Sequence, residues 1–436
     1  MVRAFGSTLR KRLAVSIGFL LSPTGDSANA AIRHVTNCGS DGSPGTLGLE
    51  VVLAAAGDTI DMTGLTCERI AVNNGGISIF RDLAIIGPGR DALTLDATHD
   101  SRVFAVYGVT TRFSAAELTI SNGAVNDYAA QGGCVYSEGS VELTNVSVVG
   151  CVATGAQSAL GGGIFSRDLT LVRSTVSGNL AYGKLANGGG IAVFNGNLVM
   201  HDSLVSSNEA RLAPESPYLS FGGGVSVGSN TETSVVTGST ISDNRSSMAA
   251  GMSFRSGIPY AGTVSIVNST VSGNTASSQT GGVYSTIPVA VSASTIAFNA
   301  AAAGPADSGL HVVGASAYIH ASIISNNTLA GHASDFSMQD ARATFAGRAN
   351  IIGSSNIELP AGTITGDPLL IPLAYNGGPT PTHAIPPESP AIDKVYPPIS
   401  FFDDQRGRGF DRMIGNGEDI GAFEYQGDAI FDNGFD

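Results

Sequence analysis

Acidic side chains are sparse in the middle of this chain, and their spacing limits the chemistry they could perform. Hydrolysis of a glycosidic bond needs two carboxylates flanking the bond, and β-elimination needs a base beside an electrophile. The acidic residues of this region are Asp127, Glu138, Glu142, Asp168, Asp202, Glu209, Glu215, Glu232 and Asp243. They fall at different points of the repeat described below, so we expect no facing pair. The sequence favours a non-catalytic chain, with a polysaccharide lyase or glycoside hydrolase as the alternative.

Bases and aromatic side chains give the same indication. His201 and Asp202 are an adjacent base and acid, but consecutive residues of a strand point to opposite faces, which argues against a dyad. We expect His311 and His320 at the surface or in turns. The chain has no Trp, and the tyrosines that could replace it as stacking platforms for sugar rings are Tyr136, Tyr182, Tyr218, Tyr260 and Tyr284.

The densest group of carboxylates lies near the C-terminus, interleaved with three arginines between positions 406 and 412. Carboxylate oxygens in a glycine-rich loop suit Ca²⁺, and the calcium candidates are Asp403, Asp404, Glu418 and Asp419. The arginines favour a loop held by salt bridges instead. We therefore expect no cofactor, with Ca²⁺ as the alternative.

A repeat of about thirty residues organises most of the chain. A short segment such as 174–179 (Ser-Thr-Val-Ser-Gly-Asn) returns with its last residue at steps of 29, 36, 30, 25 and 28 residues. These last residues are Asn179, Asn208, Asn244, Asn274, Asn299 and Asn327. A glycine cluster followed by an apolar residue, as at 163–164 and 190–191, recurs in phase with them. Two markers that repeat together define a structural unit.

Each unit contains short alternating β-rich runs and lacks the length for a crossover helix. The strands must therefore wind as a coil in which every strand pairs with its equivalent one turn away. The fold class predicted is all-β, a single-stranded right-handed parallel β-helix with an N-terminal cap and an irregular C-terminal cap. The recurring asparagines should form a structural ladder, since Asn bonds along a stack and tolerates left-handed geometry, and the glycines should form tight corners.

The composition and the N-terminal segment indicate export. Residues 1–30 contain a basic start, a short apolar run and a small-residue end, which together are typical of a signal peptide. An even number of cysteines in an exported chain favours disulfides, and we expect Cys38 with Cys67 and Cys134 with Cys151. No later stretch is apolar enough to span a membrane. The mature chain should be secreted or attached to the cell surface, in the periplasm or outside the outer membrane.

The domain organisation follows from the repeat: a signal peptide (1–30), an N-terminal cap (31–69) with a helix at 47–56, coil turns (70–352), a C-terminal region (353–426) and a tail (427–436). The tail is either an attachment signal or a strand that completes the cap. A net charge of −14 argues against nucleic acid as a partner. We expect a monomer that acts in adhesion and binds an extracellular glycan or a surface protein.

The C-terminal motifs carry a family resemblance. Residues 366–370 (Gly-Asp-Pro-Leu-Leu), 376–383, 389–393, 404–407 (Asp-Gln-Arg-Gly) and 419–424 resemble the choice-of-anchor Q domain proteins of bacteria. Residues 45–50 resemble the Cys-Ser-Leu-Arg-Glu-Ala-Ile motif of these proteins but lack its Arg. The resemblance covers nearly the whole mature chain and implies an exported, pectate-lyase-like β-helix. It implies no activity, because most members have none assigned.

Overall fold

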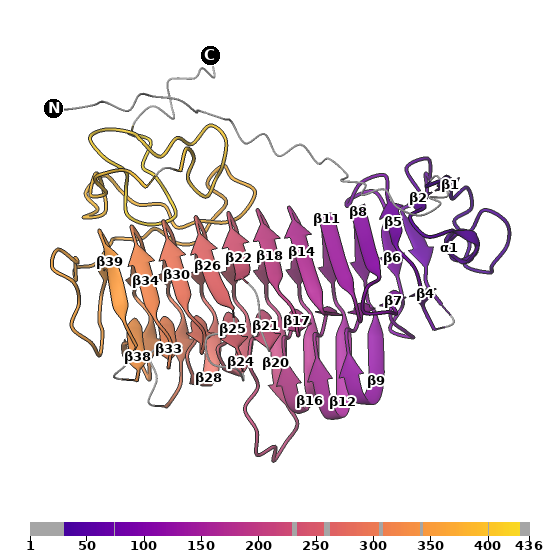
Figure 1. Cartoon of the computed structure of the whole chain (residues 1–436), viewed down its shortest axis with the longest axis horizontal. Coiled ribbons are helices and arrows are strands. Elements are labelled where there is room, and N and C mark those ends of the chain that lie inside the picture. Colours follow the sequence, from indigo (N-terminus) through magenta and orange to yellow (C-terminus); the bar gives the residue numbers. More distant parts are fainter. Residues whose placement is uncertain are drawn as a thin grey trace, which may run out of the picture.

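The computed structural model describes residues 30–73, 75–228, 233–256, 262–304, 308–340, 343–399 and 401–427. In these residues the chain is a parallel β-solenoid of about 11 turns with almost no helix. The turns stack along the long axis of the molecule (Figure 1). The all-β parallel coil predicted from the repeat is therefore confirmed. The predicted signal peptide and most of the predicted tail lie outside the described residues.

One sheet of the coil is bent into two arms, and two of its strands, β8 and β11, run through both arms. Its first arm contains β1 (Ile32–His34), β2 (Thr59–Asp61), β5 (Leu83–Ile86), β8 (Arg112–Ser121), β11 (Ser140–Val149), β14 (Asp168–Val172), β18 (Leu198–His201), β22 (Thr233–Thr237), β26 (Thr263–Val267), β30 (Val289–Ser292), β34 (Ala317–His320) and β39 (Phe345–Arg348). Its second arm adds β3 (Arg69–Ala71), β6 (Thr94–Asp96), β15 (Thr175–Ser177), β19 (Leu204–Ser206), β23 (Thr240–Ser242), β27 (Thr270–Ser272), β31 (Thr295–Ala297), β35 (Ile323–Ser325) and β40 (Ile351–Ile352). We call this the bent sheet.

Two further sheets complete the coil. The nine-stranded sheet contains β9 (Ala124–Gln131), β12 (Val152–Leu160), β16 (Leu180–Asn187), β20 (Glu209–Leu212), β24 (Arg245–Met248), β28 (Thr275–Gln279), β32 (Ala300–Ala301), β36 (Thr328–Leu329) and β37 (His332–Ala333). The ten-stranded sheet contains β4 (Ile77–Ile79), β7 (Phe104–Val106), β10 (Val135–Ser137), β13 (Ile164–Ser166), β17 (Ile191–Phe194), β21 (Val225–Gly228), β25 (Met252–Arg255), β29 (Val283–Ser285), β33 (Leu310–Val313) and β38 (Phe336–Gln339).

Buried asparagines form a continuous hydrogen-bonded ladder at the corner between the bent and nine-stranded sheets. The Oδ1 atom of Asn244 accepts the backbone N–H and the amide of Asn208, at 3.0 Å each. Its own amide donates to Asn274 Oδ1 at 2.9 Å. The same pattern joins Asn179, Asn208, Asn244, Asn274, Asn299 and Asn327 in order. The last amide donates to the carboxylate of Asp335, which ends the ladder.

Tolerance of a left-handed backbone was predicted as one reason why asparagine recurs in the ladder. The ladder asparagines themselves do not adopt that conformation. The residue before each of them does, as at Gly178 (φ 64°) and Asp243 (φ 57°). The asparagine follows with its amide directed inward, so it is selected as a buried donor and acceptor. Glycines serve the next corner as predicted: a Cβ on Gly162 would lie 2.2 Å from the carbonyl oxygen of Gly189 in the following turn.

A second ladder of buried serines lies at the bend of the bent sheet, and the sequence analysis did not predict its bonding. The Oγ of Ser239 accepts the backbone N–H of Ser203 at 3.1 Å and donates to the carbonyl of Thr237. Equivalent bonds run through Ser174, Ser203, Ser239, Ser269, Ser294 and Ser322. The Oδ1 of Asn350 accepts from the last of them. Each corner therefore satisfies its buried backbone amides from the turn above.

Apolar side chains fill the interior, and both ends of the coil are covered. Helix α1 (Leu47–Leu53), which lies within the predicted 47–56, buries Leu47 and Val51 against the first turn. At the opposite end, Ile357 and Leu359 pack on the last turns. The disulfide Cys38–Cys67 joins the cap to the first turn, and Cys134–Cys151 crosses the interior next to the asparagine ladder. Both predicted disulfides are present.

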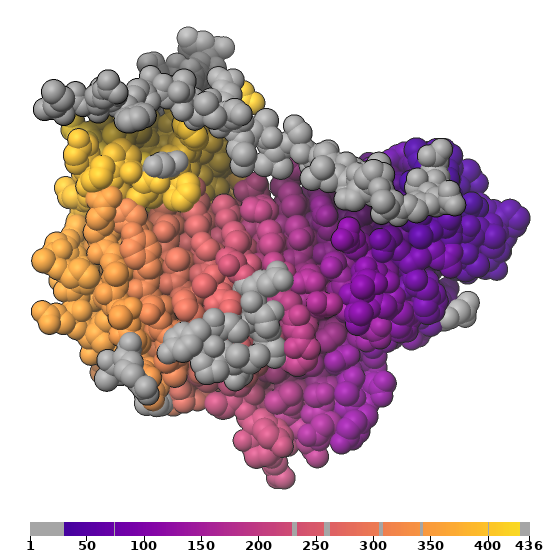
Figure 2. Space-filling view, in the orientation of Figure 1, coloured from indigo at the N-terminus to yellow at the C-terminus, as the bar shows by residue number. Residues whose placement is uncertain are grey.

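The C-terminal region does more than close the coil. After residue 366 the chain turns back and lies along the second arm of the bent sheet, above the later turns in Figure 1, and Figure 2 shows it packed directly on them. Gln405 donates to the Oγ1 of Thr240 and accepts from the Oγ1 of Thr270. The Nε2 of His383 lies 2.8 Å from the Oγ of Ser272. These outward threonines and serines are buried only because the C-terminal region covers them.

We expect Asn244→Ala to lower the free energy of unfolding by about 4 kcal/mol, because four side-chain hydrogen bonds are lost and their partners stay buried. Equilibrium urea unfolding measures the change. The control is Asn126→Ala, an exposed asparagine of β9, which should change it by less than about 0.5 kcal/mol. Equal losses in the two variants would contradict the structural role of the ladder.

Candidate functional site

Aromatic side chains gather on the outer face of the ten-stranded sheet. In its strands the inward residues, such as Val135 and Ile164, alternate with outward ones, and the parallel register aligns Tyr136 with Phe165. Phe80 and Tyr107 follow β4 and β7 by one residue and point outward as well. We call Phe80, Tyr107, Tyr136 and Phe165 the aromatic row.

The rings of the aromatic row are in contact from one turn to the next. The centroids of Phe80 and Tyr107 are 5.1 Å apart with an interplanar angle of 15°. Tyr107 lies 6.0 Å from Tyr136, which stacks on Phe165 at 5.7 Å and 9°. Phe80 is 65% exposed and Tyr107 37%, whereas Phe165 is buried. The row thus presents apolar ring faces to solvent at its N-terminal end and is supported by packing at the other.

Polar groups border the row. The guanidinium of Arg102 lies 5.4 Å from the centre of the Tyr136 ring, and its Nε donates to the carbonyls of Gln131 and Gly132. Glu138 accepts from the Tyr136 hydroxyl at 3.3 Å and from the backbone N–H of Gly108. Burial, followed by the charge of Glu138, raises the pKa of Tyr136. Tyr136 therefore stays a neutral hydroxyl and can serve as a hydrogen-bond partner at physiological pH.

A pocket adjoins the N-terminal end of the row. It has a volume of about 440 Å³ and is lined by Val51, Val52, Ile77, Phe80 and Arg81, among others. Val52 is 68% exposed at its edge. The aromatic row therefore begins at a recess beside the cap whose lining is partly apolar and partly polar.

A second aromatic group lies on later turns of the same face. Tyr284 of β29 lies 6.2 Å from Phe221 and 5.8 Å from the ring of His311. The guanidinium of Arg255 stacks on Phe221 at 3.9 Å. Between the two groups the exposed ring of Phe194 lies against β21, where a side chain at Gly228 would come within 3.3 Å of it. The face carries aromatic surface over most of its length.

Two of the tyrosines proposed from the sequence as stacking platforms lie on this face. Tyr136 and Tyr284 belong to the face, whereas Tyr182 and Tyr218 lie elsewhere, in β16 and in a loop, and Tyr260 lies outside the described residues. Phe80, Tyr107, Phe165, Arg102 and Arg255 were not predicted from the sequence. The signal was available in part, because Phe165, Tyr284 and His311 each come second after the glycine of the repeated marker, and Tyr136 comes third.

The expectation that His311 and His320 lie at the surface or in turns is wrong. His311 belongs to β33 and is 5% exposed, with Nδ1 2.6 Å from the Oγ of Ser337. His320 belongs to β34 and is 7% exposed, with Nδ1 2.9 Å from the carbonyl of Arg348. Both side chains are held by groups one turn away, which a surface position would not require.

The carboxylates of the coil are dispersed. Glu142 projects from β11, Asp168 begins β14 and Asp202 lies in the turn after β18, so the three occupy different columns of the bent sheet. His201 is exposed at the end of β18, and no hydrogen bond joins it to Asp202 among the described residues. Over the same residues, no group of three or more His, Cys, Asp or Glu side chains is arranged to hold a metal ion.

The acidic C-terminal cluster is built around two buried arginines. Arg406 pairs with Asp404 at 2.6 Å and is stacked between the rings of Phe410 and Phe423. Arg412 is fully buried and donates to the side chain of Asn268 and to three backbone carbonyls, those of Ala293, Asp419 and Gly421. These contacts fasten the C-terminal region to the bent sheet.

The four calcium candidates lie in this cluster, but three of them use their oxygens on other partners. Asp404 accepts the backbone amides of Arg406 and Glu424 besides its ion pair. Glu418 accepts the amide of Ile399, and Asp419 accepts those of Asp393 and Tyr425. Partial burial, then the charges of Asp411 and Asp404, raise the pKa of the fourth candidate, Asp403. Calcium binding here remains a prediction, and the ion-paired arrangement is the one that the geometry supports.

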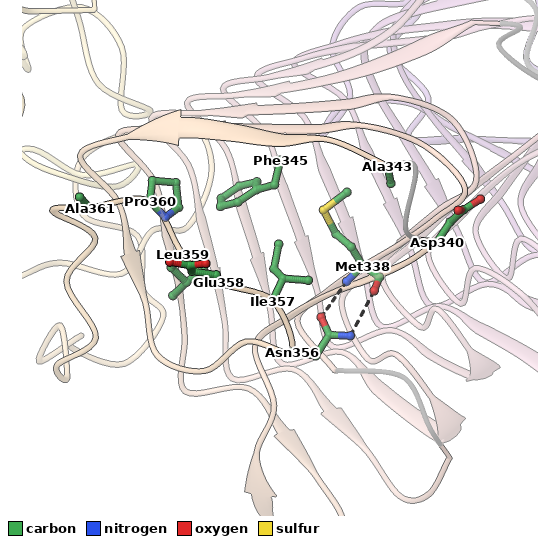
Figure 3. A pocket seen from close by; sticks show the side chains of 10 residues that line it. All are labelled: Met338, Asp340, Ala343, Phe345, Asn356, Ile357, Glu358, Leu359, Pro360 and Ala361. Carbon is green, nitrogen blue, oxygen red and sulfur yellow. Dashed lines mark hydrogen bonds between the residues drawn. The ribbon is translucent and has the colours of Figure 1, made fainter.

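A recess of about 700 Å³ lies at the C-terminal end of the coil, lined by Met338, Phe345, Ile357, Leu359 and others (Figure 3). Asn356 bonds to both backbone polar groups of Met338. Two carboxylates, Asp340 and Glu358, lie on its rim, on different segments. The recess is where stacking of turns stops, and its lining supplies packing surface instead of paired reactive groups.

The described residues include no helix long and apolar enough to cross a membrane. No protein-family model matches the chain, and no curated protein is significantly similar to it in sequence. In structure the chain is similar to the crystal structure of pectate lyase Pel9A, with a TM-score of 0.48 and 14% sequence identity. The match covers 90% of this chain and 96% of that chain. This similarity assigns no activity to the chain.

The C-terminal cluster should make stability depend on pH. Burial, then the charge of Asp419, raises the pKa of Glu424 to about 9, and burial raises that of Asp419 to about 6. A raised carboxyl pKa means that the folded chain holds its proton more tightly than the unfolded chain. The stabilisation is complete below about pH 4 and is lost as pH rises, through about 6 for Asp419 and about 9 for Glu424. The thermal midpoint should therefore fall as the pH is raised from 4 to 9. In Glu424→Gln the fall above pH 6 should be smaller than in wild type. If the midpoint of Glu424→Gln fell above pH 6 as steeply as that of wild type, this role of Glu424 would be contradicted.

Removal of metal should leave the chain unaffected. Because the carboxylates of the cluster are bonded to arginines and backbone amides, we expect excess EDTA to change the thermal midpoint by less than about 1 °C, well below the several degrees that 1 kcal/mol shifts it. Calcium at millimolar concentration should have no effect either. A calcium-dependent rise, abolished by Asp403→Asn, would instead establish the calcium alternative.

Proposed function

We propose that this chain is an exported, non-catalytic β-solenoid that binds an extracellular glycan on the outer face of its ten-stranded sheet. The observation that carries the proposal is the aromatic row, whose rings contact one another from turn to turn and whose first two rings, Phe80 and Tyr107, are exposed. The C–H face of a sugar ring packs on an aromatic face, while its hydroxyls bond to polar groups beside the ring. Glu138 and the Tyr136 hydroxyl provide such groups.

The regular rise of the coil supports a chain-like ligand. Adjacent strands of a sheet are about 4.8 Å apart, so the seven steps from β4 to β29 span about 34 Å. A polymer of several sugars could follow this face, whereas a small metabolite would occupy only part of it. A rigid coil also costs little ordering entropy when it binds, because its backbone is fixed by the corner ladders.

Export is part of the proposal. Two disulfides, with no free cysteine among the described residues, support folding in an oxidising compartment. The signal-peptide pattern of residues 1–30 and the resemblance of the C-terminal motifs to choice-of-anchor Q proteins support the same conclusion. Adhesion to a glycan-bearing surface is the role that this combination favours. The dispersed carboxylates argue against the lyase or glycosidase alternative.

Affinity electrophoresis in gels containing neutral and acidic polysaccharides tests the proposal. We expect retardation by at least one polymer, and about tenfold weaker binding for Phe80→Ala/Tyr107→Ala, because two stacked rings contribute about 0.5–1.5 kcal/mol each beyond their buried area. The matched control is Tyr128→Ala, a ring that is 69% exposed on the nine-stranded sheet; it should bind normally.

Two results would overturn the proposal. Binding that survives loss of both rings would remove the aromatic row from the site. Release of reducing or unsaturated sugar ends from any bound polymer would assign the chain to the enzymes.

A further inference from the structure

Arg255 lies near the middle of the proposed binding face. Its strand, β25, buries Phe254 in the core, so Ser253 and Arg255 on either side of it point outward. The parallel register places Arg255 beside Gly228 of the preceding turn, and the ring of Phe194 lies next to that glycine. Arg255 therefore belongs to the same surface as Phe194 and Tyr284.

The guanidinium of Arg255 has a stacking partner but no anionic partner within the described part of the chain. It lies 3.9 Å from the centre of the Phe221 ring, and its Nε is buried without a hydrogen-bond acceptor. The Oγ of the neighbouring Ser253, which is 0% exposed, also has no hydrogen-bond partner. Two buried polar groups on one strand, both directed to the same face, are left unsatisfied.

The other buried arginines of the chain show how unusual this is. Arg406 has a carboxylate at 2.6 Å, and Arg412 donates to an amide oxygen and three carbonyls. Burial lowers the pKa of Arg255, which reflects the cost of removing the cation from water. The cation persists at neutral pH because an arginine is not deprotonated in proteins. Arg255 is only partly exposed, and a cation that is partly removed from water is costly unless a counter-charge is supplied, as a ligand could do.

We propose that Arg255, on its Phe221 platform, binds a carboxylate or sulfate group of the polysaccharide, so that the ligand of this face is an acidic glycan. The inference rests on the proposed function and names its ligand class. The planar fork of the guanidinium matches two oxygens of such a group, and its two terminal nitrogens would donate to them.

The overall charge of −14 does not oppose this ligand at close range. At physiological salt, exposed charges are screened beyond about 8 Å, so the local set of charges determines what binds. Arg167, which is exposed, and the guanidinium of Arg102 lie on the same face three or more turns earlier, beyond this range of Arg255, so they would meet other units of a long polymer. Tyr284 lies between the arginine and the ring of His311, where the adjoining sugar could stack.

The experiment compares one polymer with and without its charge. A uronic-acid polysaccharide, its carboxyl-reduced neutral form and a sulfated neutral polysaccharide are titrated against the full chain by isothermal calorimetry. Wild type should bind a charged polymer about ten- to a hundredfold more tightly than the reduced form, the range of a hydrogen bond to a charged group. Arg255→Gln should lose this preference and keep its affinity for the neutral form. The two charged polymers distinguish carboxylate from sulfate.

Arg245→Gln is the matched control, because it removes the same charge from an exposed position on the nine-stranded sheet; it should preserve the preference. Arg255→Lys keeps the positive charge but lacks the planar guanidinium, so it should lose most of the preference for the charged polymer. It gives a second measurement if Arg255→Gln folds poorly. If wild type bound the charged and reduced polymers with equal affinity, and this binding depended on Tyr107, the inference would be overturned and the proposed function would stay intact. Absence of binding to every polymer would overturn both.

Discussion

The vertical register of the turns is the constraint on which the rest of the structure depends. Once each strand pairs with its equivalent one turn away, every buried group must be satisfied by the same group above it. The asparagine and serine ladders meet this demand at two corners, because an amide or hydroxyl both donates and accepts along the stack. At the end of each ladder the acceptor is a different type of residue: Asp335 ends the asparagine ladder, and Asn350 ends the serine ladder. A side chain that could only donate would leave its neighbour unsatisfied.

The same register gives the outer faces their different properties. Inward positions are constrained by packing, whereas outward positions repeat in columns that are free to vary. On the bent sheet the outward threonines and serines become a docking surface for the C-terminal region, through Gln405 and Arg412. On the ten-stranded sheet the equivalent positions carry rings and arginines instead. One scaffold thus supports a covered polar face and an open aromatic face.

Much of the fold could be predicted from the sequence, and only part of the site. The paired markers predicted the parallel coil and the ladder residues, since each is a property of one turn repeated, and the even number of cysteines predicted the two disulfides. The tyrosines at 136 and 284 were recognised as candidate stacking groups, but their ring partners were not, because Phe80 and Tyr107 precede the first clear copies of the repeat. The C-terminal acidic cluster was recognised from its composition, although composition could not show that Asp404 and Asp419 accept backbone amides.

By itself the sequence determined which residues face inward, because the spacing of asparagines, glycines and apolar residues has the period of a turn, and burial imposes that period on the chain. Only the tertiary structure decided what the outward residues do. Whether a threonine is covered, or an arginine finds a carboxylate, depends on segments far apart in the chain: Thr240 and Gln405 are separated by 165 residues, and Asn268 and Arg412 by 144. The local spacing of residues cannot predict these contacts, because they depend on where the chain returns after the coil is complete.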